Sequence, residues 1–130
     1  HIIIASDQVA SFSNQILGKP GNRNQTIHQL KQQSGQTVNF FTSVCVLNSA
    51  TNTSYIDLDT CTVYFKNLSD QQIFNYVDLE KPYDCAGVFK SEGLGIALFD
   101  KIEGEDPNAL IGLPLIKLIS LLQKFNIEIL

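Results

Sequence analysis

Apolar and polar residues recur along the chain with spacings that predict both strands and helices. The opening Ile2, Ile3 and Ile4 are β-branched, so residues 2–5 are predicted to form a strand that is buried on both faces and ends near Asp7. Residues 37–47 and 55–65 are rich in Val, Phe and Thr and enclose a polar tip, which is typical of an antiparallel hairpin. A further strand is expected at residues 95–102.

Three other segments have the periodicity of amphipathic helices. Residues 24–33 are followed by Ser34-Gly35, and glycine suits the left-handed conformation found after a helix. Ser69 and Gln72 have the spacing of a capping box at the start of a second helix. The third helix is expected at residues 113–125. The apolar positions of the three helices are Ile27, Leu30, Ile73, Tyr76, Val77, Leu115, Leu118, Ile119 and Leu122. The mixture predicts an α/β or α+β protein.

Length and charge narrow the classes of function. The chain has 130 residues, which suits a single domain, and 44% of them are apolar, which excludes wholesale disorder. Nine Lys and Arg stand against thirteen Asp and Glu, a balance that argues against a nucleic-acid partner. No window reaches the roughly 18 apolar residues of a membrane span. Three cysteines without a CxxC pair indicate reduced thiols and a cytoplasmic protein.

Asp7 and Lys19 are the first candidates for chemistry. A carboxylate at the end of a buried strand stands where open α/β sheets bind ligands, and it could hold a cation or accept a proton; alternatively, Asp7 caps a turn. Lys19 lies between Gly18 and Pro20, and its ammonium could meet a phosphate or simply be solvated.

The loop at residues 84–93 is a second candidate region, because it combines small residues, charges and Phe89 between a helix and a strand. It could present specificity residues or be a tight, solvated connection. Phe89 could stack on a base, although a loop phenylalanine more often anchors in the core. Residues 103–106 are expected to form a solvated acidic turn, and His28 to lie on the surface.

Four segments together resemble the Maf family of nucleoside triphosphate pyrophosphatases, in order and in separation, over essentially the whole chain. They are Ser6-Asp7-Gln8-Val9, Gly18-Lys19-Pro20, Asp84-Cys85-Ala86-Gly87-Val88-Phe89-Lys90-Ser91-Glu92-Gly93 and Gly112-Leu113-Pro114-Leu115. Ser34-Gly35 and Asn108 also match. Gln8 and the sequence from Lys90 to Gly93 resemble the branch acting on 7-methyl-GTP, since the dTTP/UTP branch has Thr after its Asp.

The resemblance implies an inosine-triphosphatase-like α/β fold, with a mixed sheet, flanking helices and a cleft between two lobes. It implies hydrolysis of a nucleoside triphosphate to monophosphate and pyrophosphate with a divalent metal, Mg or Mn, in a homodimer. Carried over by position, Asp7 is the proton acceptor, Gln8 and Glu92 set base specificity, and Lys19 lies near the phosphates.

One feature of the family has no counterpart here. Members have a strand and a Ser-x-Ser-x-x-Arg loop ahead of the segment that matches Asp7. Ser11 and Ser13 have the serine spacing but follow Asp7, and the sole arginine, Arg23, lies elsewhere. With His1 as the first residue and no methionine, the chain is expected to be the larger, C-terminal part of a Maf-type domain, without the arginine side of its active site. The alternative to an enzyme is a non-catalytic nucleotide-binding or regulatory protein on the same scaffold. A third hypothesis is a fragment that binds no ligand.

Overall fold

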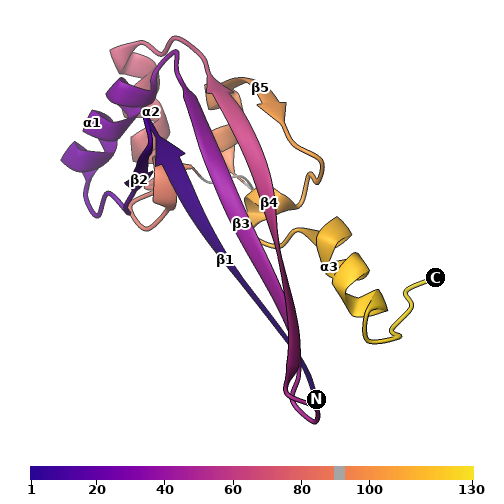
Figure 1. Cartoon of the computed structure of the whole chain (residues 1–130). Helices are drawn as coiled ribbons and strands as arrows, with labels where there is room; N and C mark the ends of the chain where they lie inside the picture. Colours follow the sequence, from indigo (N-terminus) through magenta and orange to yellow (C-terminus); the bar gives the residue numbers. More distant parts are fainter. Residues whose placement is uncertain (90–92) are drawn as a thin grey trace. The chain divides into compact units, whose positions relative to one another are not determined.

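A computed structural model describes residues 1–89 and 93–130 and places five strands and three α-helices in them (Figure 1). The strands are β1 (Ile2–Phe12), β2 (Gln15–Leu17), β3 (Thr37–Asn48), β4 (Thr53–Phe65) and β5 (Phe99–Glu103). The helices are α1 (Arg23–Gln33), α2 (Asp70–Glu80) and α3 (Leu115–Gln123), with the short 3₁₀ helices η1 (Ala86–Val88), η2 (Leu94–Leu98) and η3 (Ala109–Ile111). The order in the sheet is β2-β1-β3-β4-β5. The predicted α/β class, with helices flanking a sheet, is confirmed.

The first strand differs from its prediction. β1 continues to Phe12, and Ile2, Ile3 and Ile4 are 37%, 49% and 46% exposed, so the strand is not buried on both faces. That prediction assumed a parallel sheet, whose two faces helices cover. The pairs β1–β2 and β4–β5 are antiparallel instead, and β2 pairs with β1 only from Ala10 to Phe12.

The hairpin between β1 and β2 was not predicted. Ser13 and Asn14 make its turn with φ values of 50° and 63°, the left-handed backbone that a two-residue hairpin turn requires. Asparagine tolerates that conformation better than most residues, so Asn14 was the available signal.

The helix signals were accurate for the first two helices. Asn22 caps α1, and Gly35 follows it with φ +69°. The capping box of Ser69 and Gln72 is formed, and Ile73, Tyr76 and Val77 are the buried residues of α2. The strand expected at residues 95–102 begins later, because η2 replaces its first half; Gly95 is a poor strand residue.

Two compact units divide the described chain. Unit 1 comprises His1–Gln8, Phe41–Cys61 and Gly104–Leu130, and unit 2 comprises Val9–Phe40 and Thr62–Glu103. In unit 2, α1 packs against α2. In unit 1, α3 packs on β3 through Val44, Val46, Leu118, Leu121 and Leu122. The prediction of a single domain and that of a cleft between lobes stay predictions.

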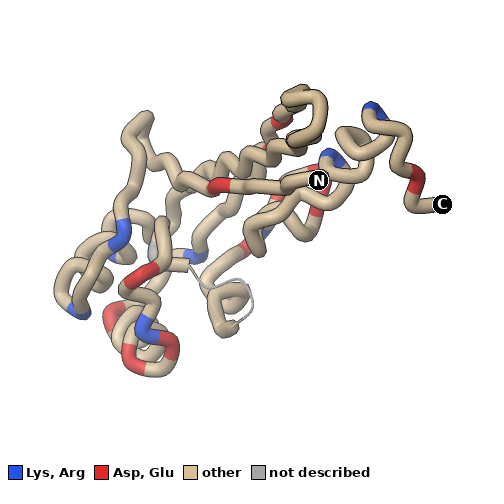
Figure 2. The backbone as a smooth tube through the Cα atoms, turned by 90° about the horizontal axis from the view of Figure 1, so that it is seen from below, with Lys and Arg blue, Asp and Glu red and all other residues tan. Residues whose placement is uncertain are grey.

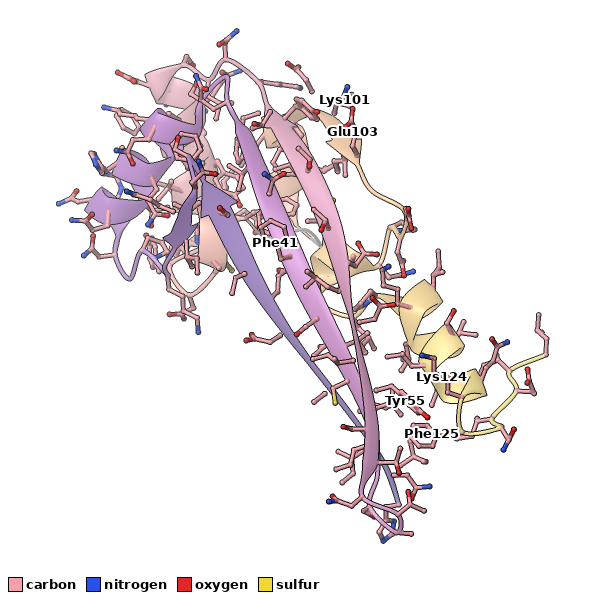
Figure 3. The ribbon with its side chains drawn as sticks, viewed as in Figure 1. Phe41, Tyr55, Lys101, Glu103, Lys124 and Phe125 are labelled. Atoms are coloured by element: carbon pink, nitrogen blue, oxygen red, sulfur yellow. The ribbon has the colours of Figure 1, made fainter. Side chains whose placement is uncertain are left out.

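The buried face of α3 is narrower than its sequence suggested. Leu121 is buried, whereas Leu115 and Ile119 are 39% and 38% exposed. At the end of α3, Phe125 lies 5.2 Å from Tyr55, ring centre to ring centre, and Lys124 Nζ lies 4.7 Å from the centre of the same Tyr55 ring (Figure 3). These contacts hold the end of α3 to β4.

No disulfide bond joins Cys45, Cys61 or Cys85 in the structure. Cys61 is buried, and burial, followed by the charge of Asp59, raises the pKa of its thiol to about 11. Such a thiol is unreactive at neutral pH. Within residues 1–89 and 93–130, no helix combines the length and the hydropathy that a bilayer crossing requires. Figure 2 shows basic and acidic residues interspersed along the described chain.

Candidate active site

Asp7 lies in the middle of β1 rather than at its end, which corrects the position predicted from the sequence. The physical reason is that residues 9–12 continue the extended chain, so Asp7 does not form a turn. Its side chain is exposed, and the backbone N–H of Gln8 donates to its Oδ1 at 2.9 Å. Ser43 Oγ donates to the backbone carbonyl of Asp7 at 3.4 Å. The carboxylate is therefore oriented by the backbone and open to solvent.

The neighbours of Asp7 attach β1 to the segment before α3. Ser6 Oγ donates to the carbonyl of Gly112 at 2.7 Å. Gln8 Nε2 donates to the carbonyl of Ala109 at 2.9 Å and, more weakly, to that of Leu110 at 3.4 Å. Two segments that carry the family resemblance, far apart in sequence, are thus joined within unit 1.

Thr42 completes this network and was not among the residues predicted from the sequence. Its hydroxyl, which is fully buried, donates to the carbonyl of Ala109 at 3.2 Å and accepts from Gln8 Nε2 at 2.9 Å. The available signal was its place in β3, where the even positions from Val38 to Val46 are buried and Thr42 is the polar one. A buried hydroxyl on such a face needs partners.

Strand alternation separates the side chains of this motif. Successive residues of a strand point to opposite faces, so Asp7 points away from the face that carries Ser6 and Gln8. The motif therefore presents a carboxylate on one face of β1 and is anchored through the other.

Lys19 lies in unit 2, in the loop after β2, and is exposed as predicted. The backbone N–H of Gly21 in the same loop donates to the carbonyl of Tyr83 at 2.9 Å. This bond ties the loop of Lys19 to the residues just before the 84–93 segment. Two further segments of the resemblance are thus neighbours within unit 2.

The 84–93 segment is described in part. Glu92, with Lys90 and Ser91, lies outside the described residues. Gly87 has φ +69°, and a Cβ there would stand 3.0 Å from the Phe40 ring and 3.1 Å from Ala10 Cβ, so both backbone and space favour glycine. Phe89 is 7% exposed and packs edge-on against Phe40 with ring centres 6.0 Å apart, so it anchors in the core and does not face a ligand.

The acidic turn at residues 103–106 is only partly solvated, which corrects its prediction. Asp106 is 2% exposed and accepts from the backbone N–H groups of Asn108 at 2.8 Å and Ile116 at 2.7 Å. Burial opposes its charge, but these hydrogen bonds prevail and hold the pKa of Asp106 below its usual value. Asp106 therefore binds the N-terminal end of α3. His28 is exposed, as predicted.

Neither of two hollows in the described surface includes the predicted site residues. In unit 1, a hollow of about 170 Å³ is lined by Asn108, Ile111, Leu113 and Leu115. In unit 2, an apolar hollow of about 220 Å³ lies between α2 and η2. Within residues 1–89 and 93–130, no three His, Cys, Asp or Glu side chains gather as a metal site.

Comparison with known proteins decides the family. The chain matches the family of Maf-like proteins over residues 1–125. The chain belongs to the Maf family. Its relatives in that family include proteins named 7-methyl-GTP pyrophosphatase from Pseudoalteromonas atlantica, Vibrio parahaemolyticus and Hahella chejuensis. They are 56%, 53% and 52% identical to it over 98%, 99% and 99% of this chain, which covers 66%, 67% and 65% of their own lengths. The chain thus spans about two thirds of the length of these Maf relatives.

Proposed function

We propose that this Maf protein hydrolyses 7-methyl-GTP, or a related modified or common nucleoside triphosphate, to the monophosphate and pyrophosphate. The observation that carries the proposal is the 56% identity, over 98% of the chain, to a relative named for that activity. We further propose that it works as a homodimer in the cytoplasm.

The proposed role of Asp7 is to accept a proton from the attacking water. The water oxygen bonds to the α-phosphorus, the bond from that phosphorus to the bridging oxygen breaks, and pyrophosphate leaves with the electron pair. An exposed carboxylate oriented by the N–H of Gln8 suits this role. Lys19, on its exposed loop, supplies positive charge to the phosphates.

A divalent metal, Mg or Mn, is the proposed cofactor. Mg²⁺ is commonly held by one or two carboxylates together with substrate phosphates, so a site need not hold a complete set of protein ligands. The exposed Asp7 carboxylate fits such a site as a single protein ligand. When bound, the metal would neutralise charge on the phosphate oxygens.

Gln8 and Glu92 are the proposed determinants of base specificity. A carboxylate at Glu92 can accept hydrogen bonds from N1–H and the 2-amino group of guanine, an edge contact that gives about 1–3 kcal/mol of discrimination in comparable base readout. Methylation at N7 places positive charge on the ring, which a nearby carboxylate favours further.

The test is pyrophosphate release from 7-methyl-GTP, GTP, UTP and dTTP with magnesium or manganese. It is made on the 130-residue chain and on a form extended at its N-terminus to the length of its relatives. The proposal expects release, fastest from 7-methyl-GTP, in the extended form. If neither form releases pyrophosphate from any of the four, the enzyme proposal fails, and a non-catalytic nucleotide-binding protein takes its place.

A further inference from the structure

We infer that Thr42 is a positioning residue for substrate selectivity: it fixes the side-chain amide of Gln8 so that only the oxygen Oε1 is offered to the nucleotide. The inference rests on the proposed function and deepens it.

The orientation of the Gln8 amide follows from the chemistry of its partners. Nε2 lies 2.9 Å from the carbonyl oxygen of Ala109 and 3.4 Å from that of Leu110. Carbonyl oxygens only accept hydrogen bonds, so a reversed amide would place oxygen against oxygen at both positions. The NH₂ group must therefore face these carbonyls.

Thr42 removes the remaining freedom of that amide. Its single hydroxyl proton is directed to the carbonyl of Ala109, at 3.2 Å, so its oxygen is left as an acceptor for Gln8 Nε2 at 2.9 Å. Thr42 is fully buried, so water does not compete for this hydroxyl. The NH₂ group is thus shared among three acceptors on two other segments of unit 1.

The free atom then determines what Gln8 can recognise. Every hydrogen bond between the Gln8 side chain and the described residues runs from Nε2, which leaves Oε1 for the ligand. Oε1 accepts hydrogen bonds, so Gln8 selects a base with an amino N–H that Glu92 leaves free. Guanine offers this donor as the second N–H of its 2-amino group, and uracil has no amino group. Asp7 points to the other face of β1, so it meets a different part of the nucleotide, the phosphates.

The experiment compares selectivity, defined as kcat/KM for 7-methyl-GTP divided by kcat/KM for UTP, in the form extended to the length of its relatives. Thr42→Val keeps the shape and removes the hydroxyl, and the ratio should fall by about threefold to tenfold, the effect of one lost hydrogen bond. Thr42→Ser keeps the hydroxyl and should keep the ratio. Thr62→Val is the matched control, because it removes a hydroxyl that donates to Asn39 Oδ1 at 2.7 Å, and it should leave the ratio unchanged.

Melting temperature is recorded for each variant, because a purely structural Thr42 would lower it without moving the ratio. A second variant, Gln8→Glu, places an acceptor against the two carbonyls and should lower the ratio even if Thr42→Val does not fold. Turnover with an unchanged ratio in these variants overturns the inference and leaves the proposed function standing. No turnover in the unaltered protein overturns the proposed function, and the inference falls with it.

Discussion

At the scale of single residues, Asp7 shows how a strand can present an exposed carboxylate in the middle of its length. Its side chain is open to solvent, while its neighbours Ser6 and Gln8 donate to the backbone of residues 109–112. The backbone at Asp7 is therefore held from the opposite face, and a carboxylate on a fixed backbone has little freedom to lose when it meets a substrate.

Asp7→Asn should lower kcat for pyrophosphate release by about 100-fold or more, as expected for the loss of a general base. The amide oxygen can still accept from the N–H of Gln8, so the melting temperature should hardly change. Asp57→Asn, which alters another exposed carboxylate on a strand of unit 1, is the matched control and should keep its activity. Near-normal turnover in Asp7→Asn would remove Asp7 from the mechanism.

Residue types and their order along the chain were enough to predict Asp7, Gln8 and Lys19 as candidate site residues. Their positions in the strands and their hydrogen-bond partners were not predictable. The prediction that Asp7 ends a strand used a rule for parallel sheets, and this sheet is antiparallel where its pairs are described. The role of Thr42 depends on contacts with residues 34 and 67 positions away, which no local pattern contains.

At the scale of elements, two buried carboxylates in unit 1 behave in opposite ways. Asp106 and Asp59 are each 2% exposed. Asp106 receives N–H groups from the start of α3, and its pKa is lowered. Asp59 Oδ1 has no hydrogen-bond partner among the described residues, and burial raises its pKa despite the nearby Lys117. Hydrogen bonding, rather than burial alone, sets the direction of the shift.

These two residues give a paired prediction for stability. Asp106→Asn should reduce the free energy of unfolding at neutral pH by about 1 kcal/mol, because one of the two carboxylate oxygens that accept backbone N–H groups becomes an NH₂ group, which leaves a buried donor unpaired. Asp59→Asn should increase it, because the unfolded state ionises more readily than the folded state. For Asp106 the folded pKa is lowered, so its contribution is lost as pH falls through that pKa. For Asp59 the folded pKa is raised, so stability is lost as pH rises from the unfolded to the folded pKa.

Urea unfolding of both variants between pH 3 and pH 7 checks this pair. Asp106→Asn should be less stable than the unaltered protein at pH 7, and this difference should shrink toward low pH. Asp59→Asn should be more stable at pH 7, and its difference should shrink toward low pH as well. Two variants that shift stability in the same direction at pH 7 would contradict the assignment.

Elements with strong local signals were predictable, and those set by distant contacts were not. The capping box of α2 and the hairpin of β3 and β4 are determined by short local sequence patterns. The acidic turn was misjudged because Asp106 is buried by α3, whose start lies ten positions later. β5 starts later than predicted, because Gly95 and its neighbours form η2. The strand propensity of a short segment depends on its packing environment, which the local sequence does not show.

At the scale of the whole molecule, the net charge of the chain disfavours binding of the proposed nucleotide ligand. The chain carries a net charge of −4, and a nucleoside triphosphate is also negative. Under the proposed function, positive charge is therefore expected to come locally, from Lys19 and a divalent metal, rather than from the general field of the protein. For this reason, nucleotide binding by this chain should depend on magnesium more strongly than nucleotide binding by a basic protein.

A thermal-shift measurement tests this requirement, and it also separates a nucleotide-binding protein from a fragment without a ligand. A ligand that binds only the folded state, at 100 times its Kd, stabilises it by about 2.7 kcal/mol, or roughly 10 °C for a chain of this size. We expect this shift in the unaltered protein with a non-hydrolysable α,β-methylene analogue of 7-methyl-GTP plus magnesium, and a smaller one with the corresponding analogue of UTP. Chelating the magnesium should abolish most of it. A full shift without magnesium would show that the protein holds the phosphates with its own groups, and that the metal is not needed to offset the net charge.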